Sequence, residues 1–404
     1  MSADIQRLNR RLASAHPSAT YRIMDRVAER RAQGAQIISL CAGEPDFDTP
    51  EHVRGAAIQA IEYGHTRYTQ VAGVRSLREA VAAKFRRENG LDISWQDTLV
   101  CNGGKQVIYN ALAATLNEGD QVIVPAPYWV SYPEMVQLCG GETRIVSCDA
   151  TTGFKLTPAA LAAAITAQTR WLILNSPSNP TGAVYSHEEL QALAEVLLAH
   201  PNVLILADDI YEHLIFDDQP FHTLAQVEPR LAARTLTMNG VSKAYAMTGW
   251  RIGFATGPRW LLQAMENLQG QQTSGACSIS QQAALAALEG PKDFIHTSRA
   301  AFQSRRDLMV KLLNDIPGLE CASPAGAFYA FACCAGLIGR TTAAGRVLHT
   351  DEDVAHALLD EADVAVVHGS AFGLGPYIRI AYALDDASLR KACEAIGQFC
   401  HSLR

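Results

Sequence analysis

The sequence predicts an α/β fold, in which a large domain with a mainly parallel sheet is followed by a smaller α+β domain. Two observations lead to this prediction. From about Asp48 to about Gly290, short β-rich runs alternate with amphipathic helical stretches, which is typical of a parallel sheet covered by helices on both faces. After Gly290 the pattern changes to a long helix, strands and a closing helix. The length of 404 residues suits two or three domains.

Two helices open the large domain. The stretch TPEHVRGAAIQAIEYG is expected to start with Thr49 as its cap and Pro50 at the first helical position, and to stop at Gly64. The stretch GVRSLREAVAAKFRRENG is a second amphipathic helix, which should end at Gly90.

Seven short β-rich runs follow, mostly separated by helical stretches. One of these separators, SHEELQALAEVLLAH, carries a capping box formed by Ser186 and Glu189. The runs are DTLVC (97–101), DQVIVP (120–125), ETRIVSC (142–148), RWLILN (170–175), NVLILAD (202–208), RTLTMN (234–239) and RIGFAT (251–256).

The smaller domain begins with a long helix, FIHTSRAAFQSRRDLMVKLLND. The stretches GAFYAFACC and VAVVHG follow as strands, and DDASLRKACEAIGQFCHSLR forms a closing helix. We therefore expect a large domain over residues 48–290 and a small domain over 291–404, with residues 1–47 as an N-terminal arm and part of the small domain. No Pro/Ser-rich linker separates the domains, which favours a site in the crevice between them.

The composition argues against several classes of protein. A formal net charge of -7 is unlike that of a non-specific nucleic-acid binder. No apolar run reaches the length of a membrane span, and the polar N-terminus lacks a hydrophobic signal core. The ten cysteines form no C-x-x-C pair and no zinc-ligand spacing. We therefore expect reduced, mostly buried thiols in a cytoplasmic protein that binds no metal.

Candidate binding residues follow the predicted strands, because ligands of an α/β sheet lie outside the carboxyl ends of its strands. The Gly103–Gly104 turn opens a helix whose free amides suit a phosphate, although such a turn is more often plain structure. Lys105 beside it could equally be a solvated surface residue. Trp129 could stack on a flat ring or simply pack, and Asn179, at a later strand tip, is equally ambiguous.

Four charged residues are more informative in combination. Asp208 ends a buried apolar strand, where a carboxylate needs a cation or a strong donor, and Tyr211 adds a phenol nearby. Lys243, just past another strand among small residues, can act as an amine nucleophile. Arg251 suits a phosphate, while Arg379 is either a fork for a substrate carboxylate or a surface arginine. Together these residues favour pyridoxal 5′-phosphate, which needs a lysine for its aldehyde and a carboxylate for its ring nitrogen.

Eight segments appear in the order expected for one family: AGEPDFDTP, YTQVAGV, NGGKQ, PYWVSYPEM, NSPSNPTGAVY, DDIYEHL, GVSKAYAMTGWRIG and YIRIAYA. Over nearly its whole length the chain thus resembles the class I aminotransferases of fold type I. It looks most like the bacterial aspartate aminotransferase subgroup, whose members include prephenate aminotransferases. The resemblance implies the pyridoxal-phosphate-dependent transferase fold type I and a homodimer with the active site at the subunit interface.

The resemblance also implies a role for each matching position. Lys243 is the Schiff-base lysine and proton shuttle, and Asp208 pairs with the pyridine nitrogen. Tyr211 and Asn179 contact the ring oxygen of the cofactor, and Trp129 stacks on its ring. The turn Gly103, Gly104 and Lys105 holds the phosphate together with Arg251. Tyr68 reaches the phosphate bound by the neighbouring subunit. The substrate α-carboxylate is bound by Arg379, Asn179, Trp129 and the Gly43 backbone, and Lys105 helps bind a distal carboxylate.

Three positions depart from the pattern of many relatives. Gly240 replaces a serine that contacts phosphate, and His368-Gly369 replaces Pro-Gly. His16 stands where relatives with acidic substrates commonly carry a lysine near the substrate side chain, so preference for such substrates is weaker or depends on pH.

The predicted activity is a ping-pong transfer of an amino group from an L-amino acid, aspartate or another acidic one, to a 2-oxo acid such as 2-oxoglutarate. Aromatic amino acids, alanine and prephenate remain alternative substrates. A pyridoxal-phosphate β-lyase or decarboxylase on the same fold is a second alternative. A non-catalytic ligand-sensing homologue is less favoured, because the full set of cofactor positions is intact.

Overall fold

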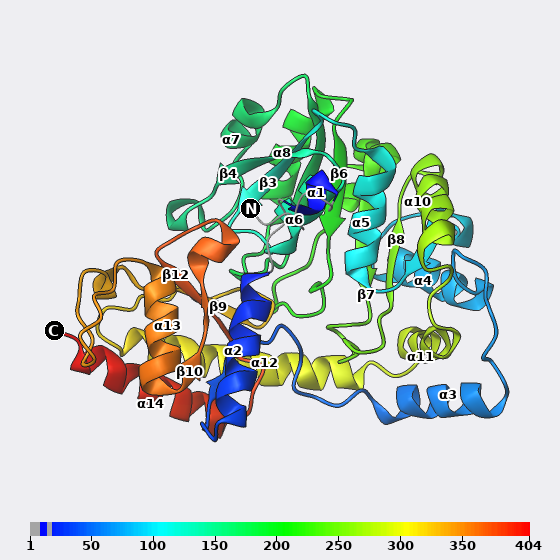
Figure 1. Cartoon of the computed structure of the whole chain (residues 1–404). Helices are drawn as coiled ribbons and strands as arrows, with labels where there is room; N and C mark the ends of the chain where they lie inside the picture. Colours follow the sequence, from blue (N-terminus) through cyan, green and yellow to red (C-terminus); the bar gives the residue numbers. More distant parts are fainter. Residues whose placement is uncertain (1–8, 14–17) are drawn as a thin grey trace.

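The computed structural model describes residues 9–13 and 18–404 (Figure 1). Its larger body is built on a seven-stranded sheet in the order β2-β8-β7-β6-β5-β3-β4. All seven predicted runs lie in this sheet. They are β2 (Thr98–Cys101), β3 (Gln121–Ala126), β4 (Glu142–Ser147), β5 (Thr169–Asn175), β6 (Leu204–Asp208), β7 (Thr235–Gly240) and β8 (Gly253–Thr256). The pairs from β4 to β7 are parallel, and β8 runs antiparallel to both of its neighbours. The predicted α/β fold with a mainly parallel sheet is confirmed.

Helices cover both faces of the sheet because successive strand residues point to opposite sides. In β6, Leu204 and Leu206 pack with one group of helices, while Ile205 packs with the other. The first group is α5 (Gly104–Thr115), α6 (Ser131–Leu138) and α10 (Arg259–Gln272). The second is α7 (Pro158–Ala164), α8 (His187–Leu198) and α9 (Leu224–Val227), with α3 (Glu51–Glu62), α4 (Arg75–Asn89) and α11 (Ser278–Glu289) packed beside the β2–β8 end.

Two of the predicted helix ends are confirmed and one is wrong. Ser186 and Glu189 form the capping box of α8, and α4 ends at Gly90 in the left-handed conformation with φ of 63°. However, α3 starts at Glu51 with Pro50 in the capping position, and Thr49 does not cap it. The Thr49 hydroxyl instead donates to the Ala246 carbonyl at 2.7 Å, a tertiary hydrogen bond that replaces the local one.

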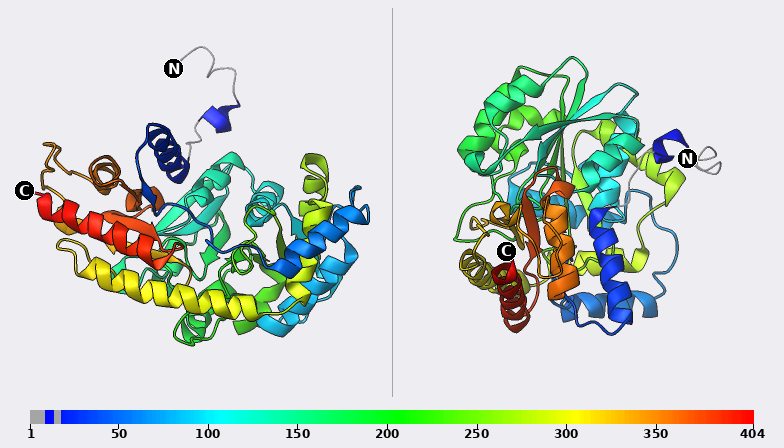
Figure 2. Two further views of the ribbon diagram at one scale, coloured as in Figure 1. Left: turned by 90° about the horizontal axis from the view of Figure 1, so that it is seen from below. Right: turned by 60° about the vertical axis from the view of Figure 1, so that its left-hand side comes forward.

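The smaller body contains an antiparallel sheet in the order β11-β12-β9. Its strands are β9 (Tyr329–Cys333), β11 (Val367–His368) and β12 (Tyr377–Ala381), and its helices are α12 (Asp293–Asn314), α13 (Asp351–Ala362) and α14 (Asp386–Ser402). The predicted strand VAVVHG is divided into β10 (Val364–Ala365) and β11, which pair with different partners. The long helix α12 runs beneath both bodies, as Figures 1 and 2 show. Short 3-10 turns are η2 (Trp95–Asp97), η3 (Ala150–Thr152), η4 (Pro229–Arg234), η5 (Ala335–Leu337) and η6 (Gly369–Phe372).

The N-terminal segment packs on the smaller body. After α1 (Arg10–Ala13) come α2 (Ala19–Ala32) and β1 (Ile38–Ser39), and β1 pairs in parallel with β10. Ile23 and Val27 of α2 share a buried cluster with Leu359, Val367 and Phe372. The arm thus contacts the small body, while the exact domain boundaries at residues 47 and 290 stay a prediction.

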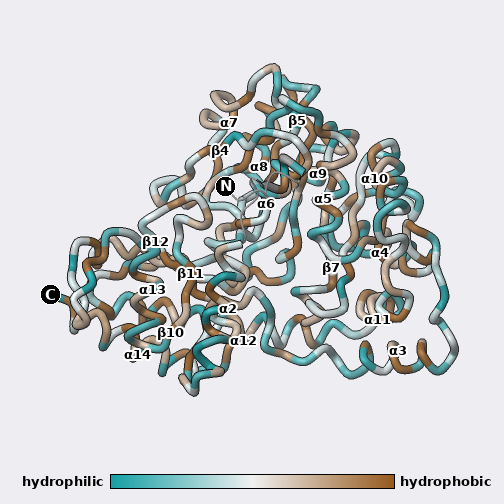
Figure 3. The backbone as a smooth tube through the Cα atoms, in the orientation of Figure 1, coloured by the Kyte–Doolittle hydropathy of each residue, from teal (hydrophilic) through white to brown (hydrophobic). Residues whose placement is uncertain are grey.

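Two sequence expectations concern the chain as a whole. No helix in the described part of the chain is both long and apolar enough to cross a membrane. All ten cysteines are free thiols, and eight of them are buried. The expectation of reduced, mostly buried thiols agrees with this arrangement. Figure 3 shows apolar segments distributed through both bodies.

Candidate active site

A cavity of about 530 Å³ lies between the carboxyl ends of the large sheet and the small body. Residues at the ends of β6 and β7 line its floor, and residues of β9, β12 and α2 close it from the other body. Most of the predicted site residues line this one cavity: Gly43, Gly104, Lys105, Trp129, Asn179, Asp208, Tyr211, Lys243, Arg251 and Arg379.

Lys243 follows β7 and points into the cavity. Its ammonium donates a hydrogen bond to the Gly43 carbonyl oxygen and lies 5.7 Å from the centre of the Tyr211 ring. Burial lowers the pKa of Lys243 to about 8, an effect that Arg251 and Arg379 increase and that Glu44 and Asp208 oppose. About a tenth of the side chain is therefore a neutral, nucleophilic amine at pH 7.

Asp208 is the last residue of β6 and is buried. The Tyr132 hydroxyl donates to its Oδ2 at 2.5 Å, and the Ile210 amide donates to its Oδ1 at 3.4 Å. Burial raises the pKa of Asp208 to about 6, although both hydrogen bonds and Lys243 act in the opposite direction. No cation of the described residues forms an ion pair with it, so this carboxylate suits a cationic ligand atom.

The first turn of α5 forms a cradle for an anion. Gly103, which caps α5, has φ of 82°, and a β-carbon there would overlap the Arg251 guanidinium. A β-carbon on Gly253 would overlap the Gly104 amide. The turn therefore brings the helix amides and the Arg251 guanidinium together, and both favour a phosphate.

Lys105 and Trp129 form a second pair in the cavity. The Lys105 ammonium lies 4.8 Å from the Trp129 ring centre, and Trp129 packs edge-on against Tyr132 at 5.4 Å. Burial lowers the pKa of Lys105, and Arg251 adds to that effect. The Trp129 ring is thus held in place between the Lys105 ammonium and the perpendicular ring of Tyr132.

Arg379 is buried on β12 with part of its guanidinium unpaired. Its Nη1 donates to Asn179 Oδ1 at 3.0 Å and its Nη2 to the Cys41 carbonyl at 2.7 Å, while its Nε has no hydrogen-bond partner in the part of the chain that the structure describes. The rings of Tyr329 and Phe372 lie 4.7 and 4.9 Å from its Cζ. Arg379 also lines the cavity, so its guanidinium is placed to meet an anion that enters it.

Two predicted site residues in the described part of the chain do not line the cavity wall, and the position of a third is not described. Gly103 lies behind Arg251 at the start of α5. Tyr68 lies on the surface with 98% of its area exposed, and no contact connects it to the cavity of its own chain. His16 lies outside the described residues.

Comparisons with known proteins identify the family of this chain. The family model described as aminotransferase class I and II matches residues 35–396. The chain belongs to this family. It is an enzyme of the transaminase type, and the predicted fold type I of these aminotransferases is confirmed.

The most similar relatives include two proteins that this aminotransferase matches over almost its full length. It is 56% identical to a probable aspartate/prephenate aminotransferase of Rhizobium leguminosarum, over 96% of this chain and 97% of that one. It is 55% identical to the aspartate/prephenate aminotransferase of Cereibacter sphaeroides, with 97% and 98% covered. The predicted resemblance to this subgroup is confirmed.

Solved structures agree with the fold of this aminotransferase. The aspartate aminotransferase of Rhizobium meliloti superposes with a TM-score of 0.96 at 51% identity, covering 98% of this chain and 100% of that one. The aspartate aminotransferase of Thermus thermophilus with maleate superposes with a TM-score of 0.91 at 42% identity, covering 97% and 99%.

The aminotransferase also contains cavity residues that sequence reasoning missed. Tyr132 lies in the first turn of α6, three residues after Trp129, and its backbone amide donates to the Trp129 carbonyl at 3.0 Å. This spacing could have indicated a shared site. Asn175 ends β5 and links Asp208 to Asn179, since its Nδ2 donates to the Asp208 carbonyl at 2.9 Å and its Oδ1 accepts from the Asn179 amide at 2.8 Å. Tyr329 had no local signal, because its partner Tyr211 is 118 residues away.

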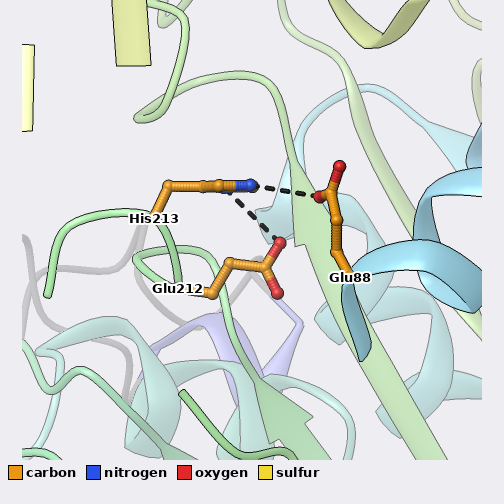
Figure 4. A group of neighbouring side chains, drawn as sticks. All are labelled: Glu88, Glu212 and His213. Carbon is orange, nitrogen blue, oxygen red and sulfur yellow. Dashed lines mark hydrogen bonds and ion pairs between the residues drawn. The ribbon is translucent and has the colours of Figure 1, made fainter. Parts of the chain in front are cut away.

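A cluster on the far side of the Asp208 turn has the residue types of a metal site. Glu88, Glu212 and His213 bring their ligand atoms within 4.8 Å of one another (Figure 4). Lys84, however, forms an ion pair with Glu212 and lies 3.7 Å from Glu88, and the Asn89 amide donates to Glu212 at 2.6 Å. The ammonium of Lys84 already supplies the positive charge, so the cluster is explained as a buried ion-pair network.

Proposed function

We propose that this enzyme is a pyridoxal-phosphate-dependent aminotransferase that moves an amino group from L-aspartate or another acidic amino acid to a 2-oxo acid such as 2-oxoglutarate by a ping-pong mechanism. One observation carries the proposal: a single cavity joins an amine, Lys243, and a buried unpaired carboxylate, Asp208, with three further cations, Lys105, Arg251 and Arg379. None of the four cations forms an ion pair among the described residues. Such a cavity suits ligands that carry a phosphate and carboxylates.

The residues fit the cofactor. Lys243 would hold the aldehyde carbon of the cofactor, and Asp208 would pair with its ring nitrogen. Tyr211 and Asn179 would contact its ring oxygen, and Trp129 would stack on its ring. Its phosphate would be held by the turn Gly103, Gly104 and Lys105 and by Arg251. When bound, pyridoxal phosphate supplies an electron sink that makes the substrate Cα–H bond acidic. Asp208 supports this sink, because a buried carboxylate without a cation favours a protonated ring nitrogen.

Lys243 is proposed to act as the base. As a neutral amine, Lys243 would take the proton from the substrate Cα and deliver it to the cofactor carbon that had carried the aldehyde. Its lowered pKa favours this role, because the neutral amine is available near neutral pH. The hydrogen bond to the Gly43 carbonyl fixes the amine within the cavity.

Two cations support a dicarboxylic substrate. Arg379 lines the cavity and is proposed to bind the α-carboxylate, together with Asn179, Trp129 and the Gly43 backbone. Lys105 is proposed to bind the distal carboxylate, in agreement with the names of the aspartate aminotransferase relatives and with the maleate of the Thermus thermophilus structure. His16 is proposed to modulate this preference.

Prephenate or an aromatic substrate is a second candidate. The cavity is also lined by Tyr21 and Met24 of α2, whose side chains are 59% and 38% exposed and offer apolar contact to a ring. Two of the similar relatives carry prephenate in their names.

The enzyme is further proposed to act as a homodimer in the cytoplasm. Tyr68, which is almost fully exposed, is the residue expected to reach the phosphate site of the neighbouring subunit. The family and the exposed position of Tyr68 support this arrangement.

A half-reaction screen tests the substrate proposal. Purified holoenzyme is mixed with single amino acids, and conversion of the bound cofactor to its amine form is followed by absorbance. Aspartate and glutamate should convert it fastest. No response to either would refute the acidic donor. Release of pyruvate, ammonia or carbon dioxide without an acceptor would instead indicate a lyase or decarboxylase.

A further inference from the structure

Tyr329 lies where the two groups of cavity residues meet. It comes from β9 in the small body and is fully buried. Its hydroxyl is 2.8 Å from the hydroxyl of Tyr211, which follows β6 in the large body. Its ring centre is 4.7 Å from the guanidinium carbon of Arg379. One side chain therefore contacts both the phenol on the cofactor side and the arginine on the carboxylate side.

Gly43 leaves room for the hydroxyl of Tyr329. A β-carbon at residue 43 would lie 2.8 Å from this hydroxyl oxygen, which is closer than real β-carbon contacts, but 3.9 Å from the ring carbon that bears it. The carbonyl of Gly43 also accepts the hydrogen bond of Lys243. Glycine at 43 is thus required by the hydroxyl of Tyr329 and not by its ring.

A proton count sets the direction of the bond between the two phenols. Each hydroxyl carries one hydrogen. If Tyr211 donates its hydrogen to the ring oxygen of the cofactor, Tyr329 has to donate to Tyr211. A hydroxyl that accepts a hydrogen bond becomes a better donor. Tyr329 then strengthens the bond from Tyr211 and stabilises the anionic form of the ring oxygen.

We propose that Tyr329 is a positioning residue with two separable parts: its hydroxyl orients Tyr211 toward the cofactor, and its ring holds Arg379 toward the substrate carboxylate. This inference rests on the proposed function, because it assigns Tyr211 and Arg379 the roles given there. It predicts that loss of the hydroxyl shifts the pH at which the bound cofactor changes its absorbance, whereas loss of the ring also weakens substrate binding.

Two variants separate these parts. In the holoenzyme, Tyr329→Phe should raise the pH midpoint of the bound cofactor's absorbance change by about half a unit or more. It should also lower kcat roughly 3- to 10-fold, while KM changes less than about twofold. Tyr329→Leu should show the same shift in midpoint and also raise the KM of the amino acid and the oxo acid about 5- to 10-fold, because the ring face on Arg379 is lost.

Tyr382→Phe is the matched control. Tyr382 is also fully buried in the small body, and its hydroxyl donates to the Ala327 carbonyl at 3.3 Å. Loss of this hydroxyl should leave the absorbance midpoint unchanged. An unchanged midpoint in Tyr329→Phe, or an equal shift in both variants, would overturn the proposal.

Gly43→Ala gives a test that leaves Tyr329 itself intact. The added methyl group should displace the Tyr329 hydroxyl and shift the midpoint, whereas in the Tyr329→Phe background it should add less than about a twofold effect on kcat. Additive effects of the two substitutions would contradict the inference. A wild-type protein that shows no cofactor absorbance would instead overturn the proposed function and the inference with it, so the two failures are distinguishable.

Discussion

Lys243 and Asp208 have perturbed acidities for one physical reason. Asp208 is buried and Lys243 is half-buried at the cavity. Loss of water disfavours the charged form, so it lowers the pKa of Lys243 to about 8 and raises that of Asp208 to about 6. The place of both residues in the cavity could be predicted from the sequence, because Asp208 ends one strand of the mainly parallel sheet and Lys243 follows another. Tyr329 could not, since it lies within a strand of another sheet and its role depends on contacts with Tyr211 and Arg379.

The acidity of Lys243 gives a pH dependence that can be measured. Only the neutral amine attacks an aldehyde, and with a pKa of about 8 roughly a tenth of Lys243 is neutral at pH 7. The rate at which apoenzyme captures pyridoxal phosphate should therefore rise about tenfold per pH unit below 8 and level off above it. Stopped-flow absorbance measures this rate, and a plateau that begins only near pH 10 would contradict the assignment.

Lys243→Ala should abolish turnover and the absorbance of the covalently held cofactor, because no other amine occupies its position. Lys311→Ala, on the exposed side of α12, is the control and should behave as wild type. Spectra and initial rates of both variants check the outcome. An active Lys243→Ala enzyme would refute the central role of this lysine.

Asp208→Asn keeps the shape of the side chain but removes its charge. An opposite charge within hydrogen-bonding distance shifts a pKa by roughly 1 to 3 units. The ring nitrogen should therefore lose its proton more easily, and kcat should fall about 10- to 1,000-fold. Steady-state kinetics test this expectation. The proposed contact would be refuted by a variant that retains wild-type kcat at pH 7.

Secondary structure was predictable where local patterns decide it. All seven strands of the large sheet and the ends of α4 and α8 follow from hydrophobic runs, glycine and the capping box. The start of α3 was misplaced, because the hydroxyl of Thr49 bonds to residue 246 instead of its own helix. The stretch VAVVHG was expected as one strand, because no local signal shows that its halves pair with β1 and β12.

The ion pair between Lys84 of α4 and Glu212 fixes the turn that follows Asp208. Both side chains are almost fully buried, with 2% and 3% exposed. Lys84→Met should destabilise the protein by about 3–5 kcal/mol, because it leaves a buried carboxylate unpaired. Adding Glu212→Gln should restore part of this loss. Urea denaturation measures the free energy of unfolding of both variants. A Lys84→Met protein with wild-type stability would contradict the buried ion pair.

The exposed apolar residues around α3 give the molecule a surface suited to association. Ile58, Ile61, Tyr63 and Tyr68 are between 55% and 98% exposed. Ile58 and Ile61 lie on α3, and Tyr63 and Tyr68 lie in the segment after it. In Figure 3, α3 is at the lower right, and its tube carries brown segments. Such a group of apolar side chains is typical of an interface, which favours the proposed homodimer.

Ile58→Glu with Ile61→Glu should convert the proposed dimer to a monomer, because two charges would be buried in the interface. Activity should fall with dissociation, since Tyr68 is expected to serve the neighbouring site. Light scattering with size-exclusion chromatography measures the mass, and Trp260→Glu, on exposed α10, is the control. A wild-type protein that is monomeric at assay concentration would refute the dimer.

The pairing of β1 with β10 bears on how the chain is made on the ribosome. Ile38 pairs with Val364, so 326 residues must be added after Ile38 before its partner exists (364 − 38 = 326). At roughly 5–20 residues per second, this interval is on the order of tens of seconds. The strands of the large sheet, by contrast, are all complete once residue 256 has been added. During this interval Ile23 and Val27 of α2 lack Leu359, Val367 and Phe372 of their buried cluster, so the arm completes its packing only after the last of these residues has been added.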